Sequence, residues 1–179
     1  MKRAQVTLEP LQPEDRERFI LDNQEAFNYG AMEEFGFRDG HMEADGQIIS
    51  REVIEASIDG EGAEAWRIVH EGRRLGGLVL QIDAAARRGE LELLFVAPKA
   101  HGLGLGYGAW LAVEALHPEI DLWETCTPYF EKRNIHFYIN KCGFAAVEFF
   151  NPRHPDPHDP EPEDADGFDG MFRFEKRIR

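Results

Sequence analysis

Apolar and polar residues recur with different periods along the first third of the chain, and each period indicates an element. Residues 6–9 predict a short strand, and a helix is expected from Leu11 to about Phe27, because Pro and two acids open it and apolar residues then recur on one stripe. Residues 28–40 are expected to be irregular, since three glycines interrupt them. Ser50 is a suitable N-cap for a second helix that ends near Ile58.

The middle of the chain carries the pattern of strands. Residues 65–70 and 75–83 predict a hairpin, and the glycine pair inside its second strand indicates a bulge or a close neighbour. Residues 91–96 are apolar apart from Glu92, which is typical of a strand that is covered on both faces. Pro98 cannot donate a backbone hydrogen bond, so this strand is expected to stop before it.

The last third alternates helical and strand patterns. In order, it predicts a helix ending at His117-Pro118, a strand over 122–126, a helix that begins at Thr127-Pro128 and ends at Gly143, and two closing strands over 144–150 and 171–176 that pair with each other. At 179 residues and 42% hydrophobic, the whole chain, residues 1–179, is expected to form one domain.

Charge and cysteine content narrow the function. The formal net charge is −14, which excludes nucleic acid and anionic membranes as main partners. Such a surface attracts cationic small molecules, although a merely soluble acidic protein looks the same. No signal peptide or membrane-spanning run is evident, and Cys126 and Cys142 are in no metal or redox spacing, so a cytoplasmic location and two buried, apolar cysteines are expected.

Residues 151–170 form the clearest break in composition. They hold five of the ten prolines, and seven acids lie between Asp156 and Asp169. Because only one strand follows, this segment is expected to be an acidic, Pro-rich loop between the last two strands rather than a linker between domains. His154, His158 and Asp159 have near-ligand spacing, but a Pro-rich loop organises ligands poorly, so no metal site is expected.

A glycine-rich loop follows the central strand, with glycines at 102, 104, 106 and 108. Glycines let a backbone approach a ligand closely, and the helix after them would point unpaired N–H groups into the loop, as a phosphate site requires. No lysine follows as a Walker loop demands, and the looser dinucleotide fingerprint should come directly after the first strand of a long alternating unit. The loop therefore indicates phosphate binding outside both of those classes.

Two motifs together resemble a known family. The pattern Val96-x-Pro98-x-x-His101-Gly-x-Gly104-x-Gly106 resembles the cofactor loop of the GNAT superfamily of acetyl-CoA-dependent N-acyltransferases, with His101 in place of the usual Arg or Gln. Downstream, Asn134-Ile-His-Phe-Tyr138-Ile-Asn-Lys-Cys-Gly143-Phe144 resembles the family's Asn-x-x-x-x-Tyr-x-x-x-Gly-Phe segment. The resemblance covers nearly the whole chain, from about Val6 to the C-terminus.

The resemblance implies an α/β (α+β) fold, with a mixed, mostly antiparallel sheet of about seven strands, flanking helices and a wedge between the splayed fourth and fifth strands. It implies acetyl-CoA as the acyl-donor cosubstrate, direct attack by an amine, and for many members a homodimer. Tyr138 would donate a proton to the departing thiolate, and the oxyanion donor would be a backbone N–H in the Leu94–Val96 region. The implied cofactor-binding residues are Leu94, Phe95, Val96, His101, Gly102, Leu103, Gly104, Leu105, Gly106, Tyr107, Asn134, Phe137 and Lys141.

Three candidate residues, Glu92, Tyr138 and Lys141, have alternative roles that their sequence context suggests. A carboxylate in an apolar strand needs a raised pKa or a partner, so Glu92, expected opposite Leu91, Leu93 and Phe95, is either a base acting through water or the partner of Arg87 or Arg88. Tyr138 lies among apolar helix residues and is otherwise a core residue. Lys141 is otherwise an exposed lysine that the helix dipole favours.

The acceptor is the least determined part of the prediction. Residues 25–64 hold eleven acids and two basic residues, and in the GNAT family this segment borders the acceptor site. An acidic rim would attract cationic amines, with Tyr29, Glu33 and Glu34 as the substrate residues, while a solvated acidic face is the alternative. Two other functions compete with acetyl transfer: a non-catalytic CoA-binding sensor or interaction domain, and a nucleotide-binding protein that uses the same loop.

Overall fold

The computed structural model describes residues 4–35, 47–158 and 170–178, except for the side chains of residues 33–35. Seven strands form one sheet in the order β1-β2-β3-β4-β5-β7-β6. All neighbouring strands are antiparallel except β4 and β5, which are parallel. The strands are β1 (Thr7–Pro10), β2 (Ala63–His70), β3 (Arg73–Asp83), β4 (Arg88–Val96), β5 (Leu122–Pro128), β6 (Ala145–Phe150) and β7 (Met171–Arg177).

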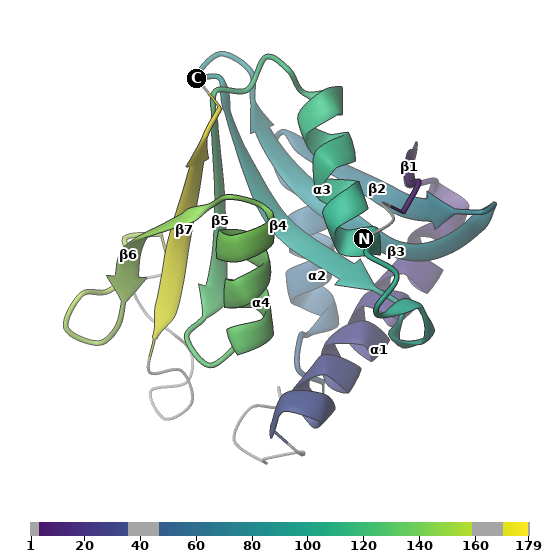
Figure 1. Cartoon of the computed structure of the whole chain (residues 1–179), viewed down its shortest axis with the longest axis horizontal. Coiled ribbons are helices and arrows are strands. Elements are labelled where there is room, and N and C mark those ends of the chain that lie inside the picture. Colours follow the sequence, from purple (N-terminus) through teal and green to yellow (C-terminus); the bar gives the residue numbers. More distant parts are fainter. Residues whose placement is uncertain (1–3, 36–46, 159–169, 179) are drawn as a thin grey trace.

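Helices cover both faces of the sheet (Figure 1). A 3-10 turn (Pro13–Asp15) leads into α1 (Arg16–Phe35), and α1 and α2 (Arg51–Asp59) pack on one face. The other face carries α3 (Leu105–Leu116) and α4 (Lys132–His136), which continues as a π-helical segment, η4 (Phe137–Lys141). Between β4 and α3 a second 3-10 turn, η3 (Pro98–Ala100), opens the glycine loop. This mixed, mostly antiparallel architecture is the predicted fold class, which is confirmed.

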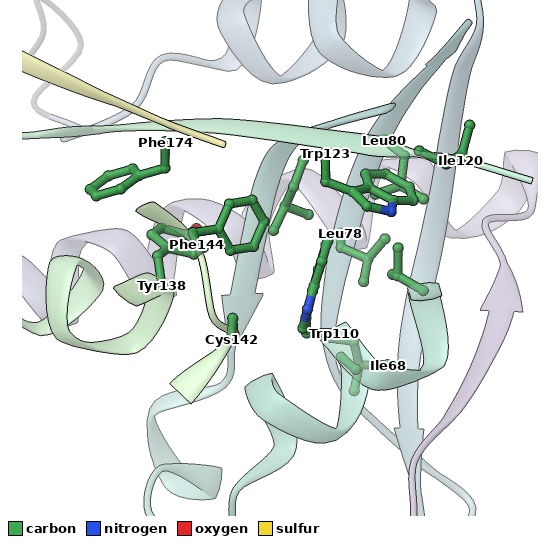
Figure 2. Close-up of a cluster of buried hydrophobic side chains, with 13 residues drawn as sticks. Ile68, Leu78, Leu80, Trp110, Ile120, Trp123, Tyr138, Cys142, Phe144 and Phe174 are labelled. Atoms are coloured by element: carbon green, nitrogen blue, oxygen red, sulfur yellow. The ribbon is translucent and has the colours of Figure 1, made fainter. Parts of the chain in front are cut away.

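Each face has its own hydrophobic core. On the α3 side, Trp110 and Trp123 meet edge to face with their ring centroids 5.4 Å apart, and Phe144 packs against Trp110 (Figure 2). On the α1 and α2 side, the ring of Phe19 meets Phe95 of β4 at 5.1 Å. Two packed layers hold β4 in place between them, and β4 is the strand that carries the predicted site.

Two predicted element boundaries are wrong, and both have local causes. Helix α1 continues beyond Phe27 to Phe35, because one glycine costs a helix only about 1 kcal/mol and the following Ala, Met and Glu residues are good helix formers. Thr127 and Pro128 belong to the end of β5 and pair with β7, so the next helix begins only at Lys132. Proline is tolerated there because it stands at the end of its strand.

The glycine pair of β3 has a close neighbour, as predicted. A Cβ at Gly76 would collide with the carbonyl oxygen of Phe95, and one at Gly77 would collide with the ring of Phe19. These two glycines therefore let β4 and α1 approach β3 closely.

A β-bulge in β4 shapes the centre of the sheet. Val79 of β3 pairs with Leu93 and Leu80 pairs with Leu91, so Glu92 is the extra residue on β4. As a result Leu91 packs in the α3-side core, while Leu93 packs in the core below α1 and α2. The parallel pairing of β4 with β5 extends only from Arg88 to Glu90, and beyond it the two strands separate, which is the splay that the predicted fold includes.

His117, the residue that caps α3, is held between two carboxylates. Its Nδ1 lies 2.8 Å from Glu119 and its Nε2 lies 2.8 Å from Glu64 of β2. Burial opposes the charged imidazolium, but the hydrogen bonds that His117 donates to Glu119 and Glu64 outweigh it and raise the pKa of His117. The ion pairs therefore join the end of α3 to β2.

Candidate active site

The glycine loop forms an open cradle at the start of α3. Gly102 has φ 82° and Gly104, the N-cap of α3, has φ 73°, a left-handed conformation that favours glycine. A Cβ at either position would meet no heavy atom within 4 Å. None of the residues that the structure describes fills the space beside these two glycines, so a ligand can approach the backbone there.

Backbone N–H groups face this space. The first hydrogen bond inside α3 runs from Gly108 N to Gly104 O, at 3.0 Å. The N–H groups of the three residues between them therefore have no partner inside the helix and point toward the loop, together with the positive end of the helix dipole. Such an arrangement binds phosphate oxygens.

Gly108, the fourth glycine of the loop pattern, has a different role. A Cβ there would lie 2.9 Å from Cγ2 of Val6 and 3.0 Å from the carbonyl oxygen of Ala4. Gly108 therefore lets the N-terminal segment pack against α3, and the expectation that it serves a ligand is wrong. Gly106 is intermediate, because its Cβ would lie 3.4 Å from Cζ of Phe137.

The exposed edge of β4 offers further donors. Ala97 N donates to Leu75 O on the β3 side at 2.7 Å, and N–H directions alternate along a strand. Phe95 therefore turns its N–H toward β3, while Leu94 and Val96 turn theirs to the opposite edge, into the wedge. All three residues predicted here line the cavity, but Phe95 is 3% exposed and its ring packs against Phe19.

A cavity of about 650 Å³ connects the cradle with the wedge. Its walls come from the second half of α1, the start of α2, the second half of β4, the glycine loop, the end of β5 and the α4–η4 segment. It includes Glu92 and Tyr138, the two predicted catalytic residues. Fold and loop thus bring together residues that are far apart in sequence.

Tyr138 lies where β4 and β5 begin to separate. Its side chain is 8% exposed, and burial raises the pKa of the phenol to about 12, so it keeps its proton at neutral pH. It forms a hydrogen bond with the side chain of Thr125, and the Thr125 hydroxyl in turn donates to Leu91 O at 2.8 Å. The interaction with Thr125 lowers the pKa of Tyr138, but the effect of burial is larger.

Glu92 has a partner that the sequence did not indicate. The buried hydroxyl of Ser57, in α2, donates to its carboxylate, which places Glu92 on the α1 and α2 face, on the same side as Leu93 and not opposite to it. The bulge is the reason, because it breaks the alternation of the strand. The alternative salt bridges are wrong as well, since Arg87 pairs with Asp121 at 2.7 Å and Arg88 with Glu124 at 3.1 Å.

The residue at the variant position of the loop turns inward. Nε2 of His101 lies 3.1 Å from Val96 O, and Nδ1 lies 3.3 Å from Nη2 of Arg133 in α4. Arg133 lines the cavity and was missed, because the sequence pattern around Asn134 and Tyr138 draws no attention to it. Only the packing of α4 beside the loop reveals it.

The side chains of the remaining predicted cofactor residues differ in whether they reach the cavity. Phe137 and Lys141 line the cavity, as does Asn134, whose Nδ2 donates to Oγ1 of Thr127 at 3.3 Å. Leu105 is 1% exposed and anchors the loop in a small core, so only its backbone faces the cradle. Two further loop residues present exposed side chains, Leu103 at 50% and Tyr107 at 36%.

Of the three predicted substrate residues, the structure describes the side chain of Tyr29. Tyr29 is not among the residues that line the cavity; its ring meets His101 edge to face at 5.4 Å. Because α1 continues as a helix, Ala26, Phe27, Gly30 and Ala31 face the cavity and Tyr29 is turned away. The side chains of Glu33 and Glu34 lie outside the described residues.

Cys126 lines the cavity and is exposed, so the prediction that both cysteines are buried is wrong for it, whereas Cys142 is 2% exposed. Desolvation raises the pKa of each thiol to about 12, which leaves both protonated at neutral pH and unsuited to act as nucleophiles. Glu90 was not considered from the sequence. Burial, with Glu92 and Glu124 nearby, raises the pKa of its carboxyl.

Among the residues that the structure describes, no group of three or more His, Cys, Asp and Glu could hold a metal ion. Within the same residues, no helix is both long and apolar enough to cross a membrane.

Comparisons with known proteins agree with this geometry. The Acetyltransferase (GNAT) family model matches residues 18–144. The uncharacterized protein YrkN of Bacillus subtilis (strain 168) is 41% identical over 181 residues, which cover 97% of this chain and 94% of that protein.

Solved structures share the fold. The ribosomal-protein-S18-alanine N-acetyltransferase of Escherichia coli has a TM-score of 0.63 at 16% identity, covering 97% of this chain and 94% of that one. The spermidine N-acetyltransferase of Vibrio cholerae, in complex with CoA and spermine, has a TM-score of 0.64 at 16% identity, with 97% and 95% covered. Since the family model spans well over half of the sequence and YrkN matches nearly all of it, this chain belongs to the GNAT family of acetyltransferases.

Proposed function

We propose that this protein is an acetyl-CoA-dependent N-acetyltransferase that moves an acetyl group to a primary amine by direct attack, without a covalent enzyme intermediate. One observation carries the proposal: an open, glycine-lined cradle leads into a cavity that also contains a protonated tyrosine and an exposed carboxylate. A protein that only bound CoA would need the cradle but not these two groups beside the wedge.

The residues of the cradle fit the cofactor. The N–H groups of Leu105, Gly106 and Tyr107 would hold phosphate oxygens, and Gly102 and Gly104 leave room for them. The N–H groups of Leu94 and Val96 would hold the arm that lies in the wedge, with the Asn134 amide, Phe137 and Lys141 on the opposite wall. When bound, acetyl-CoA supplies an acetyl thioester whose carbonyl carbon an amine can attack.

Tyr138 is proposed as the general acid. A phenol with a pKa of about 12 is protonated at every physiological pH, so it can donate its proton where a thiolate leaves. Its hydrogen bond to Thr125 fixes the hydroxyl at the point where β4 and β5 separate. Packing against Phe144 and Phe174 keeps the ring in place (Figure 2).

Glu92 is proposed as the base that takes a proton from the attacking amine, through water. Ser57 donates a hydrogen bond to its carboxylate and so fixes its orientation. An alkyl ammonium has a pKa near about 10.4 and must lose a proton before it can attack, so a carboxylate beside the acceptor has a clear task.

The acceptor is proposed to be a small-molecule or peptide amine, and a cationic one is favoured. The cavity wall between α1 and α2 is apolar, with Phe27, Ile49 and Val53. Among the described residues, the acids that line the cavity are Glu92 and Glu131. Part of the acidic segment is already paired, since Glu55 contacts Arg51 and Asp59 contacts Arg16. Spermidine and a ribosomal protein, the substrates that the similar structures name, are two kinds of amine to test.

A cytoplasmic location and a homodimer stay predictions. The edge strand β6 supports the second, because it exposes Val147 at 45% and Phe149 at 40%.

The test combines binding with turnover. Acetyl-CoA is titrated into the protein by calorimetry, and release of the CoA thiol is then followed with spermidine, aminoglycosides, lysine-rich peptides and peptides with N-terminal alanine. We expect micromolar binding and turnover of at least one amine. Binding without turnover of any amine would favour a CoA-binding sensor, and a folded protein that binds ATP or NAD but not CoA would refute the proposal.

Tyr138→Phe separates catalysis from binding. We expect kcat to fall at least about 100-fold, because a general acid contributes about 10² to 10⁴ in rate, while the dissociation constant for CoA stays the same. A variant that keeps full activity would remove Tyr138 from the mechanism.

A further inference from the structure

The contact between Arg133 and His101 indicates which ring nitrogen of His101 carries the proton. A carbonyl oxygen only accepts hydrogen bonds, so Nε2 of His101 carries the proton and donates to Val96 O, 3.1 Å away. Nδ1 then has a free lone pair, and it accepts from Nη2 of Arg133 at 3.3 Å. The neutral imidazole thus satisfies both contacts, and it holds the guanidinium beside the glycine loop.

This contact lies at the phosphate cradle. His101 is followed directly by Gly102, the first of the two glycines beside the open space. The ring of Tyr29 in α1 meets the imidazole edge to face, so His101 contacts both α1 and the arginine of α4. Arg133 itself is exposed and lines the cavity, so a ligand in the cradle can reach its guanidinium.

The positive charge of Arg133 matters at the cradle because, among the described residues, little other positive charge lies there. The chain has a formal net charge of −14, and the cradle is built of neutral N–H groups. Among the described residues that line the cavity, Arg133 and Lys141 are the arginine and the lysine. Of these, Arg133 contacts a residue of the loop, and a guanidinium binds phosphate through two parallel hydrogen bonds.

We propose that Arg133 binds the pyrophosphate of CoA and supplies, from α4, a positive charge to a cradle whose own donors are neutral N–H groups. His101 is a positioning residue that contacts the guanidinium beside the cradle, and a phosphate oxygen would replace Nδ1 in that contact. The inference rests on the proposed function, since it requires CoA in the cradle.

The experiment compares Arg133→Ala with Lys132→Ala by calorimetry. Lys132 is the matched control, because it is an exposed cation on the same helix that does not line the cavity. The ligands are CoA, dephospho-CoA, which lacks the 3′-phosphate, and pantetheine, which has no phosphate. Thermal unfolding of each variant verifies that the fold is intact.

We expect Arg133→Ala to weaken CoA and dephospho-CoA alike by about 10- to 100-fold, as for a charge-assisted hydrogen bond, and to leave pantetheine and the Lys132→Ala variant unaffected. Equal affinity of wild type and Arg133→Ala for CoA would overturn the inference alone. So would a loss that also appears with pantetheine, or one that disappears with dephospho-CoA. A folded wild type that binds no CoA would overturn the proposed function and this inference together.

Discussion

Two glycines of this protein have the same backbone conformation and the same empty surroundings, which allows a controlled test of the cradle. Gly104 in the loop and Gly72 in the β2–β3 turn both have φ 73°, and a Cβ at either would meet no heavy atom within 4 Å. They differ in position, since Gly104 caps α3 and lines the cavity, whereas Gly72 lies in a turn and does not line it. Replacing each by alanine therefore imposes the same strain in two different places.

The strain can be estimated. An L-residue in the left-handed region costs about 1–2 kcal/mol relative to glycine, and neither new methyl group adds a collision with the protein. For a chain of this size, 1 kcal/mol lowers the melting temperature by about 2–4 °C. Gly104→Ala and Gly72→Ala should therefore lose about the same stability, roughly 2–8 °C in melting temperature.

Their affinities for CoA should differ. The methyl group of Gly104→Ala would occupy the space in which phosphate oxygens approach the backbone, so we expect at least about tenfold weaker binding, or 1.4 kcal/mol. Gly72→Ala should bind like wild type. Calorimetry with CoA and a thermal scan measure both quantities on the same samples. Equal loss of affinity in the two variants, or none in Gly104→Ala, would refute the assignment of the cradle.

Two further predictions concern groups that support the site and the fold. Ser57→Ala should lower kcat for the amine without changing the affinity for CoA, because it removes the hydrogen bond that orients Glu92; steady-state kinetics and calorimetry check this, and an unchanged kcat would exclude Ser57 from the mechanism. His117→Gln should destabilise the protein most at acid pH. The two carboxylates, Glu64 and Glu119, outweigh the effect of burial and raise the pKa of His117 in the folded state. The contribution of His117 to stability is therefore complete below about pH 6.5 and is lost as pH rises through the folded-state pKa. Urea unfolding of both proteins at pH 5.5 and 8.5 measures the difference, and a stability gap that grows with pH would contradict the assignment.

Much of the fold could be predicted because local patterns agree with it. The hairpin around Gly72, the cap at Ser50 and the strand after Arg88 each rest on residues that are neighbours in sequence, where turn chemistry and periodicity apply directly. The loop from Gly102 to Gly106 was predictable for the same reason, since an unusual run of glycines has a local cause.

What the sequence could not show depends on contacts between distant segments. Ser57 meets Glu92, and Arg133 meets His101, only because α2 and α4 pack beside β4 and its loop. Gly108 looked like part of the loop, and only the position of the N-terminal segment reveals its packing role. No periodicity or spacing contains such information.

The bulge at Glu92 connects these observations. Placing one extra residue in β4 puts Glu92 and Leu93 on the α1 and α2 face, which brings the carboxylate within reach of Ser57 and the cavity. The same strand stops pairing with β5 after Glu90, and the edge that is released turns backbone N–H groups into the wedge. Tyr138 then lies at the point of separation, tied through Thr125 to Leu91, the residue just before the bulge. A regular β4 would place Glu92 and Leu93 on opposite faces of the sheet, so the carboxylate could not share the α1 and α2 face with Leu93.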